Sequence, residues 1–145
     1  MRSKKGAERT QQAVELLRTW QGLERAAINT TAEIMEATDN LLIRQLMEII
    51  RNDSVQHHRV QQFLIDTMTR KAVSLSPKDM AEVWGRIQDH DKLERETIEL
   101  AKQLQAECPD PVARIFLQYL ITDEQKHDTL IGELEKLKRH MSKRA

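Results

Sequence analysis

The chain has 145 residues, 23 basic and 23 acidic side chains, 39% hydrophobic residues and one cysteine, Cys108. That length suits one domain with a hydrophobic core. The balanced charge argues against a protein that binds nucleic acid through general phosphate attraction, and no hydrophobic run approaches the ~20 residues of a membrane-spanning helix. Residues 1–10 lack the hydrophobic stretch of a secretory signal, and a lone cysteine fits a reducing compartment. We therefore expect a cytoplasmic protein that binds neither nucleic acid nor membrane.

Helix-breaking residues are few and divide the chain into four segments. With four glycines, three prolines and abundant Leu, Ala, Glu, Lys, Gln and Arg, the composition favours helix throughout. Ser76 followed by Pro77 and Asp79 is typical of a helix start, and Asp110–Pro111 repeats part of that signature. The pair Asp39–Asn40 is the one good break before residue 71. These signals predict helices over residues 8–38, 40–71, 77–107 and 111–142.

Each predicted helix carries hydrophobic residues at spacings of three and four, as amphipathic helices do. Four such helices with short links predict an all-α, four-helix bundle made of two helical hairpins, residues 8–71 and 77–142, within one domain over residues 1–145. The basic ends, residues 2–5 and 136–144, are expected to be frayed, solvated tails. The predicted core stripes include Leu17, Trp20, Ile34, Ile43, Ile50, Val60, Trp84, Ile98, Leu104 and Leu120.

The two predicted hairpins match each other when residue 23 is aligned with residue 93. Leu23-Glu24-Arg25 recurs as Leu93-Glu94-Arg95, and Asp53 and His57 recur as Asp123 and His127 without a gap. The matches include polar residues on the hydrophobic stripes, where chance would favour leucine. We interpret the chain as two related hairpins, and an ancestral duplication is our hypothesis for their origin.

Five acidic or imidazole side chains fall on these stripes near the middle of their helices: Glu24, His57, Glu94, Glu124 and His127. A charge on a core face is costly unless it is paired or binds a metal. Glu124 and His127 form a Glu-x-x-His motif, whose spacing places carboxylate and imidazole on one side of a helix. Such oxygen and nitrogen donors suit iron, manganese or zinc. The pattern predicts a metal site; the alternative is a buried layer of ion pairs, for example with Arg44 and Arg114.

The segment from Glu94 to His127, with its Asp110–Pro111 helix start and Asp123-Glu124, resembles the ferritin-like superfamily, and most of all its rubrerythrin-type domains. That family holds two irons between a Glu on each of two helices and a Glu-x-x-His on each of the other two. The resemblance covers about residues 8–140. It implies that Glu94 is a terminal ligand, that Glu124 bridges the irons and that His127 binds one of them. Glu24 and His57 take the equivalent terminal and imidazole roles in the first hairpin.

By the same resemblance, the protein is expected to bind iron and to act as an oxidase, a peroxidase or an iron-handling protein, with O2 or peroxide as oxidant. The alternative function is a non-catalytic helical bundle whose vestigial metal site serves a structural or interaction role. The sequence identifies no redox partner.

One position departs from the family pattern. Ser54, three residues before His57, stands where the first hairpin should hold its bridging Glu, and a hydroxyl is a poor replacement for a carboxylate. Asp53 and Asp123 are each four residues before a histidine, and we expect them to accept the imidazole N–H rather than bind metal. A site with two irons and one carboxylate bridge, a site with one iron near Glu124, and complete loss of metal all remain alternatives.

The predicted link between the hairpins, Ala72–Ser76, is short. It reaches at most about 18 Å when extended, less than the ~45 Å length of a 30-residue helix, whereas ferritin-like bundles usually cross from end to end at this point. The chain therefore predicts either a simple up-down-up-down bundle or two chains that exchange hairpins, and we expect a homodimer. His90, one turn before Glu94, is expected at the surface or beside the site, with a ligand role as the alternative.

Overall fold

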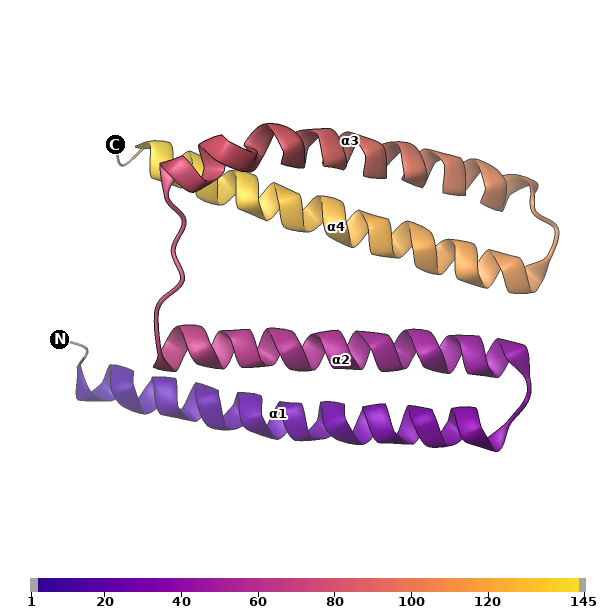
Figure 1. Ribbon diagram of the computed structural model, residues 1–145, viewed down its shortest axis with the longest axis horizontal. Coiled ribbons are helices and arrows are strands. Elements are labelled where there is room, and N and C mark those ends of the chain that lie inside the picture. The colour runs from indigo at the N-terminus through magenta and orange to yellow at the C-terminus, as the bar shows by residue number, and fades with distance from the viewer. Residues whose placement is uncertain (1–2, 144–145) are drawn as a thin grey trace. The chain divides into compact units, whose positions relative to one another are not determined.

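A computed structural model describes the backbone of residues 3–143 and the side chains of residues 3–141 (Figure 1). It contains four long helices and, over those residues, no strand. The helices are α1 (Lys4–Ala37), α2 (Leu41–Thr69), α3 (Pro77–Glu107) and α4 (Pro111–Lys143). The predicted all-α fold with four helices is confirmed, and the predicted boundaries differ from the observed ones by only a few residues. None of the helices in the described part combines the length and the hydrophobicity needed to cross a membrane.

Polar side chains cap the helices where the sequence predicts breaks. The Asn40 side chain accepts a hydrogen bond of 3.1 Å from the backbone N–H of Ile43 and starts α2. Ser76 and Asp79 form a reciprocal capping box at the start of α3, with Pro77 as the first helical residue. The basic ends were expected to be frayed, solvated tails; their described side chains are mostly exposed, but the backbone there is helical. Ser3 caps α1, so the helix already includes Lys4, and α4 continues to Lys143; residues 1, 2, 144 and 145 lie outside the described part.

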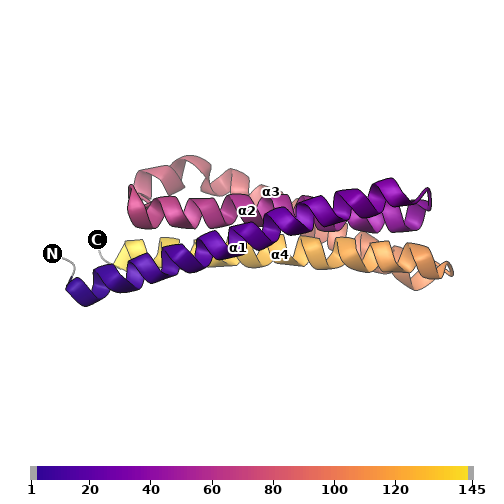
Figure 2. The same cartoon turned by 90° about the horizontal axis from the view of Figure 1, so that it is seen from below.

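The helices pack in two pairs, α1 with α2 and α3 with α4 (Figures 1 and 2). The chain divides between Val73 and Ser74 into two compact units, which coincide with the predicted hairpins. Within each unit the two helices run antiparallel and lie side by side in Figure 1, in agreement with the contacts between them. The link between α2 and α3 comprises residues 70–76, and the predicted bundle topology and homodimer stay predictions.

Each hairpin buries a narrow seam between its two helices. Leu17 and Ile65 are the buried hydrophobic residues of the first hairpin, and Met80, Ile98 and Ile121 are those of the second. Buried polar residues are more numerous than buried hydrophobic ones over the described residues: Gln21, Glu24, Thr31, Ser54, Gln61, Asp91 and Glu94. The seams are therefore unusually polar, and their polar groups need partners.

Several positions predicted for the core lie outside these seams. Trp20 is 53% exposed, and Trp84 is half-buried with the Lys138 ammonium 4.7 Å from its ring centroid. The expectation that Trp20 packs in the core is wrong for the described hairpin, because contact between two helices buries a narrower stripe than a complete bundle does. The same holds for Ile34, Ile43, Ile50, Val60, Leu104 and Leu120, which are all exposed.

Candidate metal centre

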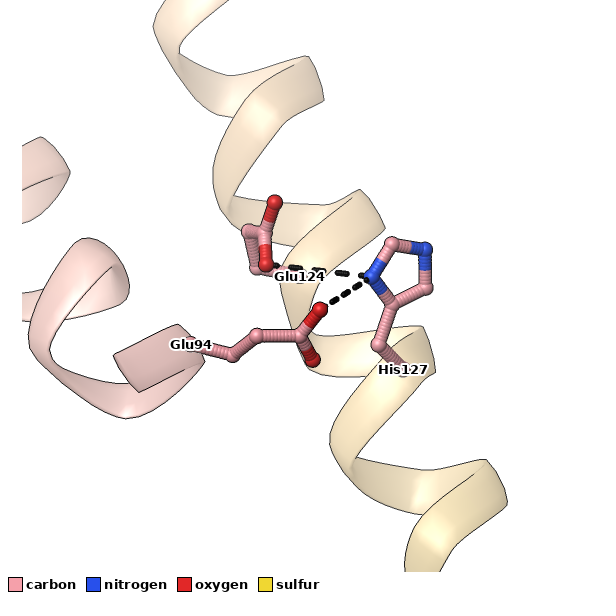
Figure 3. A group of neighbouring side chains, drawn as sticks. All are labelled: Glu94, Glu124 and His127. Carbon is pink, nitrogen blue, oxygen red and sulfur yellow. Dashed lines mark hydrogen bonds and ion pairs between the residues drawn. The ribbon is translucent and has the colours of Figure 1, made fainter. Parts of the chain in front are cut away.

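Three of the predicted ligands converge within the α3–α4 hairpin. Glu94 extends from α3 towards α4, where Glu124 and His127 project from the same side of the helix one turn apart (Figure 3). One donor atom from each residue lies within 4.8 Å of the other two. The spacing of three residues explains why α4 presents its carboxylate and imidazole together. Two carboxylate oxygens and one imidazole nitrogen form a donor set that suits iron, manganese or zinc.

Glu94 is the buried centre of this group. The residue is 9% exposed. Its Oε1 lies 3.0 Å from Nδ1 of His127 and 2.9 Å from Nε2 of His90. Its Oε2 is buried and has no hydrogen-bond partner among the described residues. A buried carboxylate oxygen without a partner is costly, so Glu94 has one oxygen available for a cation.

His127 faces carboxylates on both sides of its ring. Its Nδ1 lies 3.0 Å from Glu94 and 3.7 Å from Oε2 of Glu124, while its Nε2 lies 3.6 Å from Oδ2 of Asp123. Asp123 also forms an ion pair of 3.0 Å with Lys126. A neutral imidazole carries a proton on one nitrogen only. If that proton faces Asp123, the Nδ1 lone pair points at the Glu94–Glu124 side, where a metal would accept it.

The first hairpin brings together Glu24 and His57 but arranges them differently. Glu24 is 8% exposed, and its Oε1 lies 3.4 Å from Nδ1 of His57. The same oxygen accepts a hydrogen bond of 3.4 Å from the Gln61 amide, which reaches across from α2. Ser54 is buried nearby on α2 and supplies no carboxylate. The first hairpin therefore offers two donor residues, Glu24 and His57, whereas the second hairpin offers three.

The two hairpins also differ in the predicted aspartate partners of their histidines and in the predicted ion pairs. Asp123 lies 3.6 Å from His127, whereas no hydrogen bond or ion pair joins Asp53 to His57 within residues 3–141. The alternative of a buried ion-pair layer is wrong for Arg44. Its guanidinium donates to the backbone carbonyls of Met35 and Thr38 and so caps the end of α1.

Comparison with known proteins identifies no relative. No family model, no curated protein and no solved structure matches the chain. The structural features that bear on function are therefore the four helices and the carboxylate–histidine group on α3 and α4.

An acidic pair beside this group was missed by the sequence analysis. Asp91 is buried, and Arg95 forms ion pairs of 3.0 Å with Asp91 and 3.2 Å with Asp128. Burial first, and then a hydrogen bond to Asp128 and that carboxylate's charge, raise the pKa of Asp91 above its ordinary value. The hydrogen bond from Asp91, followed by its contacts with Arg95, lowers the pKa of Asp128. Of the two carboxyl groups, Asp91 therefore keeps its proton to higher pH than Asp128 does, because the pKa of Asp91 is raised and that of Asp128 is lowered.

The repeat contained the signal that would have found this pair. Residues 21, 25 and 58 of the first hairpin align with residues 91, 95 and 128 of the second. They are also in contact: the Gln21 amide donates to the His58 carbonyl at 3.4 Å, and the Arg25 guanidinium lies 3.2 Å from Nε2 of His58. A position that supports a polar cluster in one hairpin therefore predicts a polar cluster in the other. Gln61 gave no such signal, because residue 131 at the aligned position is isoleucine.

Proposed function

We propose that the chain is a ferritin-like metal-binding protein that holds iron between α3 and α4. The observation that carries the proposal is the environment of Glu94. One of its oxygens, Oε2, is buried without a partner among the described residues, and one donor atom each of Glu94, Glu124 and His127 lies within 4.8 Å of the other two. Buried carboxylates that lack partners are rare in proteins unless they serve binding or catalysis.

The residues on α3 and α4 fit iron. Glu94 and Glu124 would supply oxygen ligands, His127 would supply Nδ1, and Asp123 would fix the imidazole from its other nitrogen. Iron held by carboxylates and one imidazole would supply one-electron redox chemistry towards O2 or peroxide, as in the oxidases and peroxidases that the resemblance implies. His127 would orient the site, and the half-buried Glu124 would lie on its solvent side.

We further propose that each chain binds one iron rather than two. In the first hairpin the Gln61 amide donates to the Glu24 oxygen that faces His57, and Ser54 replaces the third ligand. A cation there would have to displace an existing hydrogen bond and would gain one carboxylate fewer. Glu24, His57 and Gln61 are therefore better suited to a polar contact that holds α1 and α2 together.

That contact favours a second candidate function, a non-catalytic bundle. Glu24, His57 and Gln61 interact without any metal, and Gln61 is only 2% exposed. If the α3–α4 group served the same purpose, both hairpins would use polar seams only to fix the packing of their helices. The buried Glu94 oxygen without a partner is what favours iron binding over this alternative.

The test is metal content after anaerobic loading with Fe(II) and desalting. We expect about one iron per chain, retained in the Glu24→Gln/His57→Ala variant and lost in the matched Glu124→Gln/His127→Ala variant. Iron binding should also raise the unfolding temperature of the wild type, because a ligand at 100 times its Kd stabilises the native state by about 2.7 kcal/mol. Failure to retain iron, with no change in unfolding temperature, would overturn the proposal and leave the non-catalytic bundle.

A further inference from the structure

The contacts around Glu94 place a fourth residue at the metal centre. His90 lies one helical turn before Glu94 on α3, and its Nε2 is 2.9 Å from Oε1 of that carboxylate. The His90 side chain is 62% exposed, whereas that of Glu94 is 11% exposed. His90 therefore reaches inward from the edge of the helix to a buried group. Its own helix geometry favours this contact, because residues four apart lie on the same face.

The group of three possible metal donors, Glu94, Glu124 and His127, does not include His90. His90 contacts Oε1, the oxygen that already has neighbours, and leaves Oε2 buried without a partner. A hydrogen bond to one oxygen of a carboxylate fixes the rotation of the group and thereby the direction of the other oxygen. His90 thus lies where it can orient Glu94 without occupying the metal position.

We propose that His90 is the positioning residue of this centre: it donates its Nε2 proton to Oε1 of Glu94 and so holds that carboxylate in the orientation in which it faces Glu124 and His127. The inference rests on the proposed function, since it assigns His90 a role only if the α3–α4 group binds metal. Hydrogen-bonded partners of ligating groups commonly contribute ~10–100-fold in metal affinity.

The first hairpin shows what the absence of such a donor means. The residue aligned with His90 is Trp20, which is 53% exposed and makes no hydrogen bond to Glu24 within the described first hairpin. Glu24 instead receives its hydrogen bond from Gln61 on the opposite helix. In the second hairpin, His90 on the glutamate's own helix and His127 on the opposite helix both contact Oε1 of Glu94. The contact from the glutamate's own helix is the one that the first hairpin lacks.

The test uses Co(II) as the probe, because its visible absorption reports the ligand set independently of any activity. Wild type, His90→Ala, His90→Gln and the control His140→Ala, an exposed histidine on α4, are compared in affinity and spectrum. We expect His90→Ala to lower the affinity ~10–100-fold with an unchanged spectrum. His90→Gln, whose amide can still donate to Glu94, should restore most of it, and His140→Ala should match the wild type.

The other outcomes separate the inference from the function on which it rests. An affinity of His90→Ala equal to that of the wild type would overturn the positioning role and leave the metal site intact. Loss of binding in both His90 variants, with a changed spectrum in any residual complex, would make His90 a ligand and would also overturn the positioning role. A wild-type protein that binds no Co(II) and no Fe(II) would overturn the proposed function itself. Since the His90 side chain is largely exposed, both substitutions should preserve the fold, which circular dichroism checks.

Discussion

The two hairpins place a buried glutamate at the same repeat position and satisfy it in opposite ways. Glu24 accepts a hydrogen bond from Gln61 on the facing helix, whereas Glu94 is contacted by His90 on its own helix and by His127 on the facing one. Glu94 retains a buried oxygen without a partner. Related sequences thus give one seam whose glutamate has an amide partner from across the interface and one whose glutamate keeps a buried oxygen without a partner among the described residues.

The difference depends on few positions. Ser54 aligns with Glu124 and Gln61 aligns with Ile131, and both exchanges bear directly on the buried glutamate. In the first hairpin an amide replaces the contacts that a cation would make, and in the second a carboxylate from α4 adds a charge that a cation would neutralise. If the first hairpin binds no metal, as we propose, the Gln61 amide reduces the cost of burying Glu24 there.

The largest expected effect comes from making the first hairpin resemble the second. The variant Ser54→Glu/Gln61→Ile supplies a carboxylate one turn from His57 and removes the amide that binds Glu24. We expect iron bound per chain to rise from about one to about two, since the first hairpin would then offer the same three donors. Metal analysis after anaerobic Fe(II) loading measures the change.

The single substitutions are the controls for this variant. Gln61→Ile alone frees Glu24 but adds no ligand, and Ser54→Ala removes only a hydroxyl, so both should keep the wild-type metal content. A double variant that still binds the wild-type amount would show that the hairpins differ in more than these two positions. It would contradict our account of why only one of them is open to iron.

The helix boundaries and the shared face of Glu124 and His127 could be predicted from the sequence, because they depend on residue spacing and on capping residues. Proline and capping residues such as Ser76 and Asn40 determine where helices begin, and the Glu-x-x-His spacing places Glu124 and His127 on one face. Those features act within one helix and need no tertiary contact. The Ser3 cap was overlooked because the lysines that follow it resemble a solvated tail.

Features that depend on how two helices meet could not be predicted in the same way. Which stripe residues become buried depends on the line of contact, so Trp20 was expected in the core and is exposed. The role of Gln61 depends on its reaching Glu24 across the interface, and an uncharged residue on a hydrophobic stripe gives no reason to expect it. Asp91 likewise becomes distinctive only through its burial and its contact with Asp128.

A smaller effect is expected from the acidic pair. Asp91→Asn gives the second hairpin an amide where the first has Gln21. Because the pKa of Asp91 is raised in the native state by burial, by Asp128 and, to a smaller extent, by the charge of Glu94, the native state binds more protons than the unfolded state above the ordinary pKa of aspartate. The free energy of unfolding of the wild type should therefore fall relative to that of Asp91→Asn as pH rises through this window.

The difference in unfolding free energy is measured by denaturant unfolding of both proteins between about pH 3 and 7. This range brackets the ordinary pKa values of carboxyl groups. The difference in unfolding free energy between the two proteins should stop changing with pH once Asp91 has lost its proton. Asp128 has a lowered pKa and contributes the opposite dependence, with stability lost as pH falls, but the amide of the variant can still donate to it. A difference in unfolding free energy that is constant over the whole pH range would contradict the raised pKa of Asp91.

The smallest expected effect concerns the N-terminal caps of α2 in the first hairpin and α3 in the second. The Asp79 carboxylate accepts hydrogen bonds from the hydroxyl and the backbone N–H of Ser76, which lower its pKa, whereas α2 is capped by the uncharged Asn40. A lowered pKa means stability that is present above the ordinary value and is lost as pH falls through the native pKa. Acid should therefore loosen the start of α3 but leave the start of α2 unchanged.

The amide signal of Ser76 in NMR spectra should titrate with Asp79 and should stop doing so in Asp79→Asn. Asn40→Ala, by contrast, should destabilise the protein by about 1 kcal/mol at every pH tested. A Ser76 signal that ignores pH would mean that the carboxylate does not hold the cap, and the α3 start would then owe its position to Pro77 and the Ser76 hydroxyl.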